Sequence, residues 1–126
     1  MSTSTESSGP RTPDASVRVV ALDDLPASAT ARELVGADHG GAGVCLIFVD
    51  APPGHGPSLH RHPYEEVFVV QEGEATLVAD GEERVVRAGE VVIVPAGVAH
   101  SFVNSGDGPL RQLDIHVSPR FDTEWL

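Results

Sequence analysis

The chain has 126 residues, of which 40% are hydrophobic, and a formal net charge of −11. This length suits one domain with one moderate core. Its 19 acidic residues face only 8 basic ones, all arginine, so the surface repels phosphate backbones and anionic lipid headgroups. We therefore expect no nucleic-acid partner and no membrane partner.

The sequence also favours a cytoplasmic protein. No apolar run approaches the roughly 18 residues that a bilayer-spanning helix needs. The first 16 residues, MSTSTESSGPRTPDAS, lack both the basic start and the apolar segment of a signal peptide. Cys45, the only cysteine, cannot form an internal disulfide and suits a reducing compartment. Its neighbours in VCLIFV indicate a buried thiol on a strand.

In chain order, residues 1–16 are too poor in apolar side chains to pack, and they read as a disordered tail before a single domain at 17–126. Residues 17–22, VRVVAL, predict a short strand, and residues 29–35 predict a second. The four glycines between 36 and 43 indicate a loop. Residues 44–51, VCLIFVDA, are nearly all apolar, as in a strand buried on both faces.

The middle of the chain predicts strands joined by tight turns. Residues 65–71, EEVFVVQ, form a strand on which Glu66, Phe68 and Val70 share one face. Asp80-Gly81 is a strong signal for a two-residue hairpin. Pro95 suits a strand end, because its missing N–H does little harm there. Helix signals are weak throughout, so the predicted fold class is all-β.

The last predicted strand, residues 110–117, leaves two orientations open. Gln112, Asp114 and His116 share one face, and the residues between them form an apolar face. If the polar face looks inward, Asp114 and His116 contact substrate or support a site. If the apolar face does, both lie on the surface.

Four residues have the chemistry of metal ligands. His60 and His62 are two apart, so both side chains point to one face of a strand. Glu66 lies an even number of residues further on, and His100 comes from a distant stretch. Neutral imidazole with carboxylate suits a divalent transition metal. Two histidines at strand spacing, a nearby glutamate and a third histidine are seldom coincidental, so we predict a metal site.

These stretches resemble the two motifs of the cupin family. Residues 54–73 fit G-x5-H-x-H-x3-E-x6-G, and residues 89–104 fit G-x5-P-x-G-x2-H-x3-N, with a match at every fixed position. The resemblance implies a small antiparallel barrel, the double-stranded β-helix, with His60, His62, Glu66 and His100 holding one metal ion inside. Fe or Mn is favoured, and Zn, Ni, Co or Cu remains open.

The resemblance does not imply one reaction, since cupins include many kinds of enzyme as well as non-enzymatic binders. We expect a metal-dependent enzyme of dioxygenase type with a small-molecule substrate. The alternatives are a redox-neutral metal-assisted isomerase or cyclase, and a non-catalytic metal or small-molecule binding module. Glu66 and Tyr64 are the candidate catalytic residues. Phe68, Phe102, Asp114 and His116 are the candidate pocket residues.

Finally, the strand patterns predict a homodimer. A closed barrel this small needs one face of each strand for its interior, yet several strands carry apolar residues on both faces. Soluble proteins seldom expose a large apolar patch, and two-fold pairing is the commonest way to cover one. Trp125 and Leu126 also need a surface to cover them.

Overall fold

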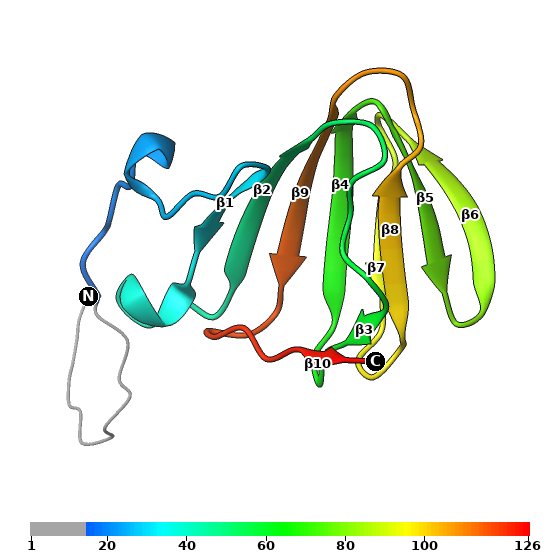
Figure 1. Cartoon of the computed structure of the whole chain (residues 1–126). Coiled ribbons are helices and arrows are strands. Elements are labelled where there is room, and N and C mark those ends of the chain that lie inside the picture. Colours follow the sequence, from blue (N-terminus) through cyan, green and yellow to red (C-terminus); the bar gives the residue numbers. More distant parts are fainter. Residues whose placement is uncertain (1–14) are drawn as a thin grey trace.

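A computed structural model describes residues 15–126 as two antiparallel sheets of five strands each (Figure 1). Within these residues no helix is long and apolar enough to cross a membrane. The expected tail at 1–16 lies almost wholly outside the described residues. The elements are η1 (Leu22–Asp24), β1 (Ala31–Leu34), η2 (Gly36–Asp38), β2 (Cys45–Ala51), β3 (His60–Arg61), β4 (Glu66–Glu72), β5 (Glu74–Ala79), β6 (Glu82–Arg87), β7 (Val91–Val94), β8 (His100–Asn104), β9 (Leu110–His116) and β10 (Glu124–Trp125).

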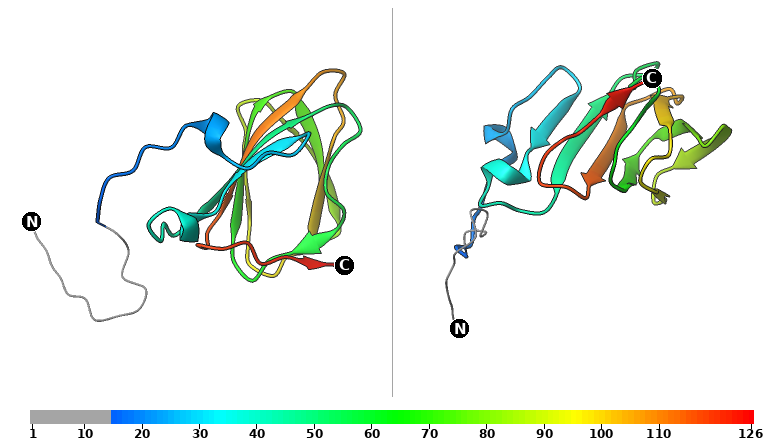
Figure 2. Two further views of the ribbon diagram at one scale, coloured as in Figure 1. Left: turned by 60° about the vertical axis from the view of Figure 1, so that its left-hand side comes forward. Right: turned by 90° about the horizontal axis from the view of Figure 1, so that it is seen from below.

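The strands form two sheets that face each other. One sheet has the order β1-β2-β9-β4-β7 and the other the order β10-β3-β8-β5-β6. Figure 2 shows the sheets as the two walls of a flattened barrel, with the C-terminal segment crossing one end. This arrangement is the double-stranded β-helix, and it confirms the all-β prediction.

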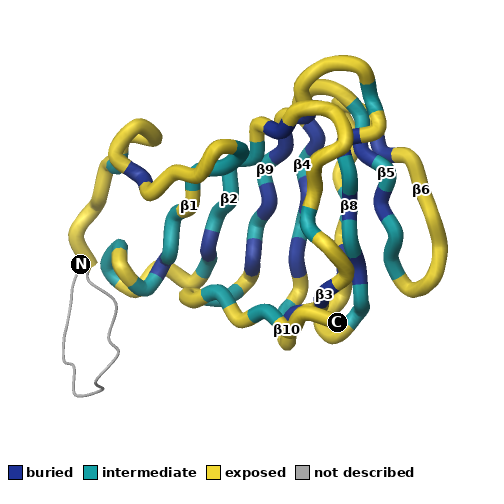
Figure 3. The backbone as a smooth tube through the Cα atoms, viewed as in Figure 1, coloured by how far each residue is buried: buried dark blue, intermediate teal, exposed yellow. Residues whose placement is uncertain are grey.

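Alternating side chains build the interior. On β4, Glu66, Phe68 and Val70 are buried while the residues between them are only half-buried, and β8 and β9 show the same period (Figure 3). The apolar part of this interior is one cluster, centred on the rings of Phe68 and Phe102 and on Leu110. The buried polar side chains are His60, His62, Glu66, His100, Asn104, Gln112, Asp114 and His116.

The register of β9 decides between the two orientations left open by its sequence. Asp114 pairs with Phe68 and His116 pairs with Glu66, and directly opposed residues of an antiparallel pair share a face. The polar face of β9 therefore looks into the barrel, and its apolar residues look outward.

The predicted Asp80-Gly81 hairpin is confirmed. Both residues have positive φ, 52° and 76°, as the turn between β5 and β6 requires. Asn104 ties two turns together: its amide donates to the carbonyls of Ala51 and Gly108, and its Oδ1 accepts from the Gly106 N–H.

The strand expected at residues 17–22 is wrong. Val17 and Val19 are 94% and 95% exposed, and the chain enters the short turn η1 instead of a sheet. A β-branched run forms a strand only where a neighbouring strand offers hydrogen bonds and a surface, and no described strand lies beside these residues.

The burial expected for residues 44–51 is only partly found. Within β2, Cys45 and Ala51 are buried, but Asp50 is exposed and the residues between are half-buried. The outward-facing side chains of β2 belong to the outer face of the first sheet and remain partly accessible.

We predict that the apolar cluster carries most of the stability. Leu110 is 0% exposed, so Leu110→Ala should lower the free energy of unfolding by about 2–5 kcal/mol, through lost burial and a residual cavity. Leu22, which is 49% exposed, is the matched control, and Leu22→Ala should cost less than about 1 kcal/mol. Urea unfolding of both variants measures this. Equal losses would contradict the assignment of the core.

Candidate metal centre

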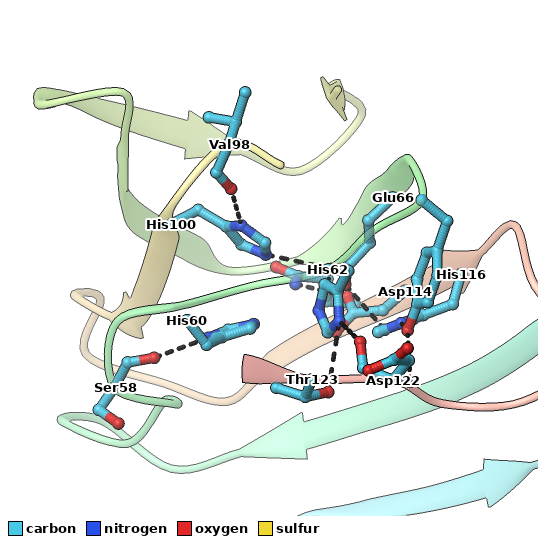
Figure 4. Close-up of polar contacts among 12 residues, drawn as sticks. Ser58, His60, His62, Glu66, Val98, His100, Asp114, His116, Asp122 and Thr123 are labelled. Atoms are coloured by element: carbon cyan, nitrogen blue, oxygen red, sulfur yellow. Dashed lines mark hydrogen bonds and ion pairs between the residues drawn. The ribbon is translucent and has the colours of Figure 1, made fainter. Parts of the chain in front are cut away.

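Four buried side chains from three strands and one loop converge at one end of the barrel. His60 lies on β3 directly opposite His100 on β8, Glu66 begins β4, and His62 lies between β3 and β4. One ligand atom from each of these four residues lies within 4.8 Å of those of the others. Figure 4 shows His62, His100 and Glu66 turned toward one another. The structure thus brings together the four residues that the sequence predicts as ligands.

Each of the three imidazoles is held by a backbone carbonyl at its Nδ1 atom. Nδ1 lies 2.7 Å from the Ser58 carbonyl for His60, 2.8 Å from the Asp122 carbonyl for His62 and 2.9 Å from the Val98 carbonyl for His100. A carbonyl can only accept, so Nδ1 must carry the proton and donate. In the neutral ring Nε2 then presents a lone pair, as a metal ligand requires.

The contacts of Glu66 show that a cation fits this centre. Its Oε1 atom lies 3.1 Å from the Nε2 atoms of both His62 and His100. Lone pairs facing a carboxylate at that distance repel each other unless the rings are protonated or a cation lies between them. His62 Nε2 is buried and lacks a hydrogen bond of acceptable geometry among the described residues. The donor set of imidazole and carboxylate suits a divalent transition metal.

Protonation of these groups follows from burial and charge. Burial alone would raise the pKa of Glu66, but the imidazoles of His100, His116 and His62 outweigh it and lower that pKa below its ordinary value. Burial lowers the pKa of His60, which keeps that ring neutral. Burial also acts to lower the pKa of His62, but Glu66 and the Asp122 carbonyl raise it overall.

His116 contacts the same carboxylate from the other side. Its Nε2 atom lies 3.0 Å from Glu66 Oε2, and its Nδ1 atom lies 2.7 Å from the Tyr64 hydroxyl. That hydroxyl accepts from the Asp122 N–H at 3.3 Å, so its own proton is free to be donated to His116 Nδ1. Like His62 Nε2, His116 Nε2 is buried and makes no hydrogen bond of acceptable geometry among the described residues, although it lies close to Glu66. This imidazole differs from the three ligands because its Nδ1 contacts a hydroxyl and not a backbone carbonyl.

Asp114 adds a second carboxyl group to the interior. Its Oδ1 atom accepts a hydrogen bond of 2.7 Å from the Gln112 amide. Burial and the nearby charge of Glu66 raise the pKa of Asp114 well above its ordinary value. Burial therefore favours the protonated form of Asp114 more than that of an exposed aspartate.

The C-terminal segment, residues 118–126, is part of the centre, and the sequence analysis missed this. Besides the Asp122 carbonyl on His62, the Trp125 ring lies 5.0 Å from the His60 ring and the Phe121 ring 4.9 Å from the His116 ring. Strand β10 pairs with β3, which brings Trp125 opposite His60. The only sequence signal was Trp125 and Leu126 themselves, two large apolar residues without an assigned surface.

A cavity of about 560 Å³ is lined by three of the four ligands, His60, His62 and Glu66. Among the predicted pocket residues, Phe102, Asp114 and His116 line it. Phe68 instead packs within the apolar cluster, 5.5 Å from the Phe102 ring. Tyr64 does not line the cavity, but its ring stacks on that of His62 at 4.9 Å and its hydroxyl contacts His116. His55 is exposed and also lines the cavity.

A sequence comparison matches these elements to a known family. Residues 47–116, more than half of the chain, match the profile of the cupin domain. The chain belongs to the cupin family. The matched range includes all four ligands of this cupin and stops before the C-terminal segment that supports two of them. A search of curated protein sequences gives no match.

Solved structures with the same fold include oxalate-metabolising enzymes. Oxalate oxidase superposes with a TM-score of 0.72 at 26% identity, covering 86% of this chain and 63% of that chain. Bacillus subtilis oxalate decarboxylase, studied for its Mn(II) centres, gives 0.69 at 25% identity, covering 81% and 29%. Lactobacillus farciminis oxalate decarboxylase gives 0.72 at 23% identity, covering 83% and 34%, and shows the fold alone. This cupin thus spans less than two thirds of each of these proteins.

We predict that the protein binds one divalent transition-metal ion through His60, His62, Glu66 and His100. Loss of an outer hydrogen bond to a ligand alone weakens metal affinity about 10–100-fold, so His100→Ala should weaken it by at least about 100-fold. Elemental analysis of the purified protein and calorimetric titration with Mn(II) measure this. His39→Ala, in the loop at 36–43, is the control and should keep full metal content. Stoichiometric metal in His100→Ala would refute the assignment.

Proposed function

We propose that this cupin is a mononuclear metal enzyme that oxidises a small organic substrate bound at the metal. The observation that supports this most strongly is the arrangement of the ligands: three Nε2 lone pairs and one carboxylate oxygen converge beneath an open cavity of about 560 Å³. Four protein ligands on a six-coordinate ion leave two positions free. A free position is what separates a catalytic centre from a closed structural one.

Manganese is the metal that the comparisons favour. Oxalate oxidase has been solved with the substrate analogue glycolate, and the Bacillus subtilis decarboxylase has Mn(II) centres. Imidazole and carboxylate ligands also suit Fe(II). When bound, the metal would supply a Lewis acid with accessible redox states at the floor of the cavity.

The protein's own groups would orient the substrate and handle its protons. His116, held by Tyr64, lies 3.0 Å from the second oxygen of Glu66 and would limit how that carboxylate can turn. Asp114, held by Gln112, is the group best placed to donate a proton within the cavity. Phe102 and Phe121 exclude water from part of the wall.

Asp114 also supports the second candidate function. An acid of raised pKa beside a Lewis acid suits a redox-neutral isomerase or cyclase, because such reactions move a proton without transferring electrons. A binding module without catalysis would need the metal and the cavity but not this acid.

We predict that water reaches the bound metal. In the Mn(II)-loaded protein, water-proton relaxation should be enhanced, since free coordination positions hold exchangeable water. The control sample contains the same concentrations of protein and Mn(II), but an added chelator holds all of the Mn(II). Relaxation no faster than that of a fully chelated Mn(II) complex would indicate a closed site and contradict an enzymatic role.

Oxygen dependence then separates the two enzymatic candidates. A panel of small chelating diketones and hydroxyketones is incubated with the loaded protein, and both oxygen uptake and product are measured. The oxidative proposal expects uptake that Glu66→Gln abolishes. Product formed equally well without oxygen would favour the isomerase or cyclase.

We propose further that the protein is a homodimer. Nine outward-facing residues of the first sheet are apolar: Leu34, Leu46, Phe48, Leu113, Ile115, Val67, Val69, Val91 and Ile93. The charged residues Arg32, Asp50 and Arg111 share this face. Ile93 and Val91 are 66% and 59% exposed. Soluble proteins seldom leave a contiguous apolar patch uncovered, and a second copy is the simplest cover.

We predict a mass near twice 13.2 kDa by light scattering at micromolar concentration. Ile93→Glu should halve it, because a charge at the centre of an apolar contact would lose its hydration. Val85→Glu, at an exposed position on β6 of the other sheet, is the control and should leave the mass unchanged. A wild-type mass near 13.2 kDa would rule out the dimer.

A further inference from the structure

The cavity above the metal ligands has an apolar wall away from the metal. Strand β2 turns Ile47, Val49 and Ala51 into it, and Phe102 and Phe121 add aromatic rings. The metal ligands occupy one end of the same space. A ligand filling the cavity would therefore have two parts: a polar end at the metal and an apolar body against β2.

Among the described residues, the cavity lining contains carboxyl groups but no lysine or arginine side chain. The three carboxyl groups are those of Glu33, Glu66 and Asp114. Glu33 is on the inward face of β1, paired with Ile47, at some remove from the ligands. Apart from a bound metal and the imidazoles of His55 and His116, no described group on these walls could pair with an anionic group of a substrate.

The size of the cavity also exceeds what a two-carbon acid needs. Its volume of about 560 Å³ lies within the range of about 300–1,000 Å³ that holds drug-sized ligands. Oxalate bound at the metal would leave the β2 wall in contact with water, with no gain from apolar burial.

We propose that the substrate is an uncharged organic molecule with an apolar, ring-sized body and a pair of oxygen donors that bind the metal. This inference rests on the proposed function, since it assumes an open metal position at the cavity floor. It differs from what the comparisons suggest, because it excludes oxalate and other small dianions as the preferred ligands. The formal net charge of −11 acts in the same direction, by repelling anions at long range.

Hydroxamic acids test this, because the chelating end stays constant while the body changes. The probes are acetohydroxamate, benzohydroxamate, 4-carboxybenzohydroxamate and oxalate, titrated calorimetrically into the Mn(II)-loaded full-length protein. Each affinity is divided by that of the same probe for free Mn(II). Benzohydroxamate should exceed acetohydroxamate by at least about tenfold, because several ring carbons leave water and each buried carbon contributes about 0.8 kcal/mol.

The charged probe tests the electrostatic part. The 4-carboxylate should cost at least about tenfold relative to benzohydroxamate, since it must leave water beside apolar and acidic walls. Glu33, although it lines the cavity, is exposed, and Glu33→Gln should recover about threefold of that loss, the scale of one exposed charge pair. Glu83→Gln, at an exposed position of β6 outside the cavity, is the matched control and should recover nothing.

The possible failures are distinct. If no probe binds the loaded protein above its affinity for free Mn(II), the open metal position of the proposed function is absent and both proposals fall. If the probes bind but acetohydroxamate equals benzohydroxamate, or oxalate or the carboxylated probe binds best, the substrate class is wrong while the proposed function stands. Full recovery of affinity in Glu83→Gln would also overturn it.

Discussion

The centre depends on one repeated interaction, a backbone carbonyl that accepts the Nδ1 proton of a histidine. It occurs three times, at His60, His62 and His100, and each time it leaves the Nε2 lone pair aimed at the same place. Without it the rings could rotate or change tautomer, and a metal would have to organise them at the cost of its own binding energy. The strands on either side hold these three loop carbonyls in position.

Two of those carbonyls lie next to the histidines that they serve, and the third does not. Ser58 and Val98 each lie two residues before their histidine, so a local chain bend suffices. Asp122 lies sixty residues beyond His62 and arrives there only because β10 pairs with β3. The Trp125 ring then packs near the His60 ring, and the Phe121 ring packs near the His116 ring. The last nine residues thus belong to the centre both electrostatically and sterically, although they lie beyond the range that defines the family.

This contrast explains what the sequence could predict. The ligands were predictable because strand periodicity and fixed motif spacing are local properties, and the fold followed from the same two stretches. Which face of β9 looks inward was not predictable, because Gln112, Asp114 and His116 alternate with apolar residues in either orientation. Only the pairing of β9 with Glu66 and Phe68 on β4 decides the orientation. The strand prediction for residues 17–22 was wrong for a related reason: a strand needs a neighbouring strand, which β propensity alone does not supply. No sequence pattern predicts the hydrogen bond between His62 Nδ1 and the Asp122 carbonyl, since every residue has a carbonyl.

In the barrel, most residues that stabilise the fold are separate from those that line the cavity. The apolar cluster around Phe68 and Leu110 fills one part of the interior, and the buried polar groups other than Asn104 and Gln112 gather at the end where the cavity opens. Phe102 belongs to both, packing on Phe68 and lining the cavity. A change in the β2 wall or in the C-terminal segment can therefore alter which molecules enter while the cluster keeps the strands paired. Because the ligands stand on strands that the cluster holds together, the metal centre keeps its geometry when the wall facing it changes, and specificity can vary independently of stability.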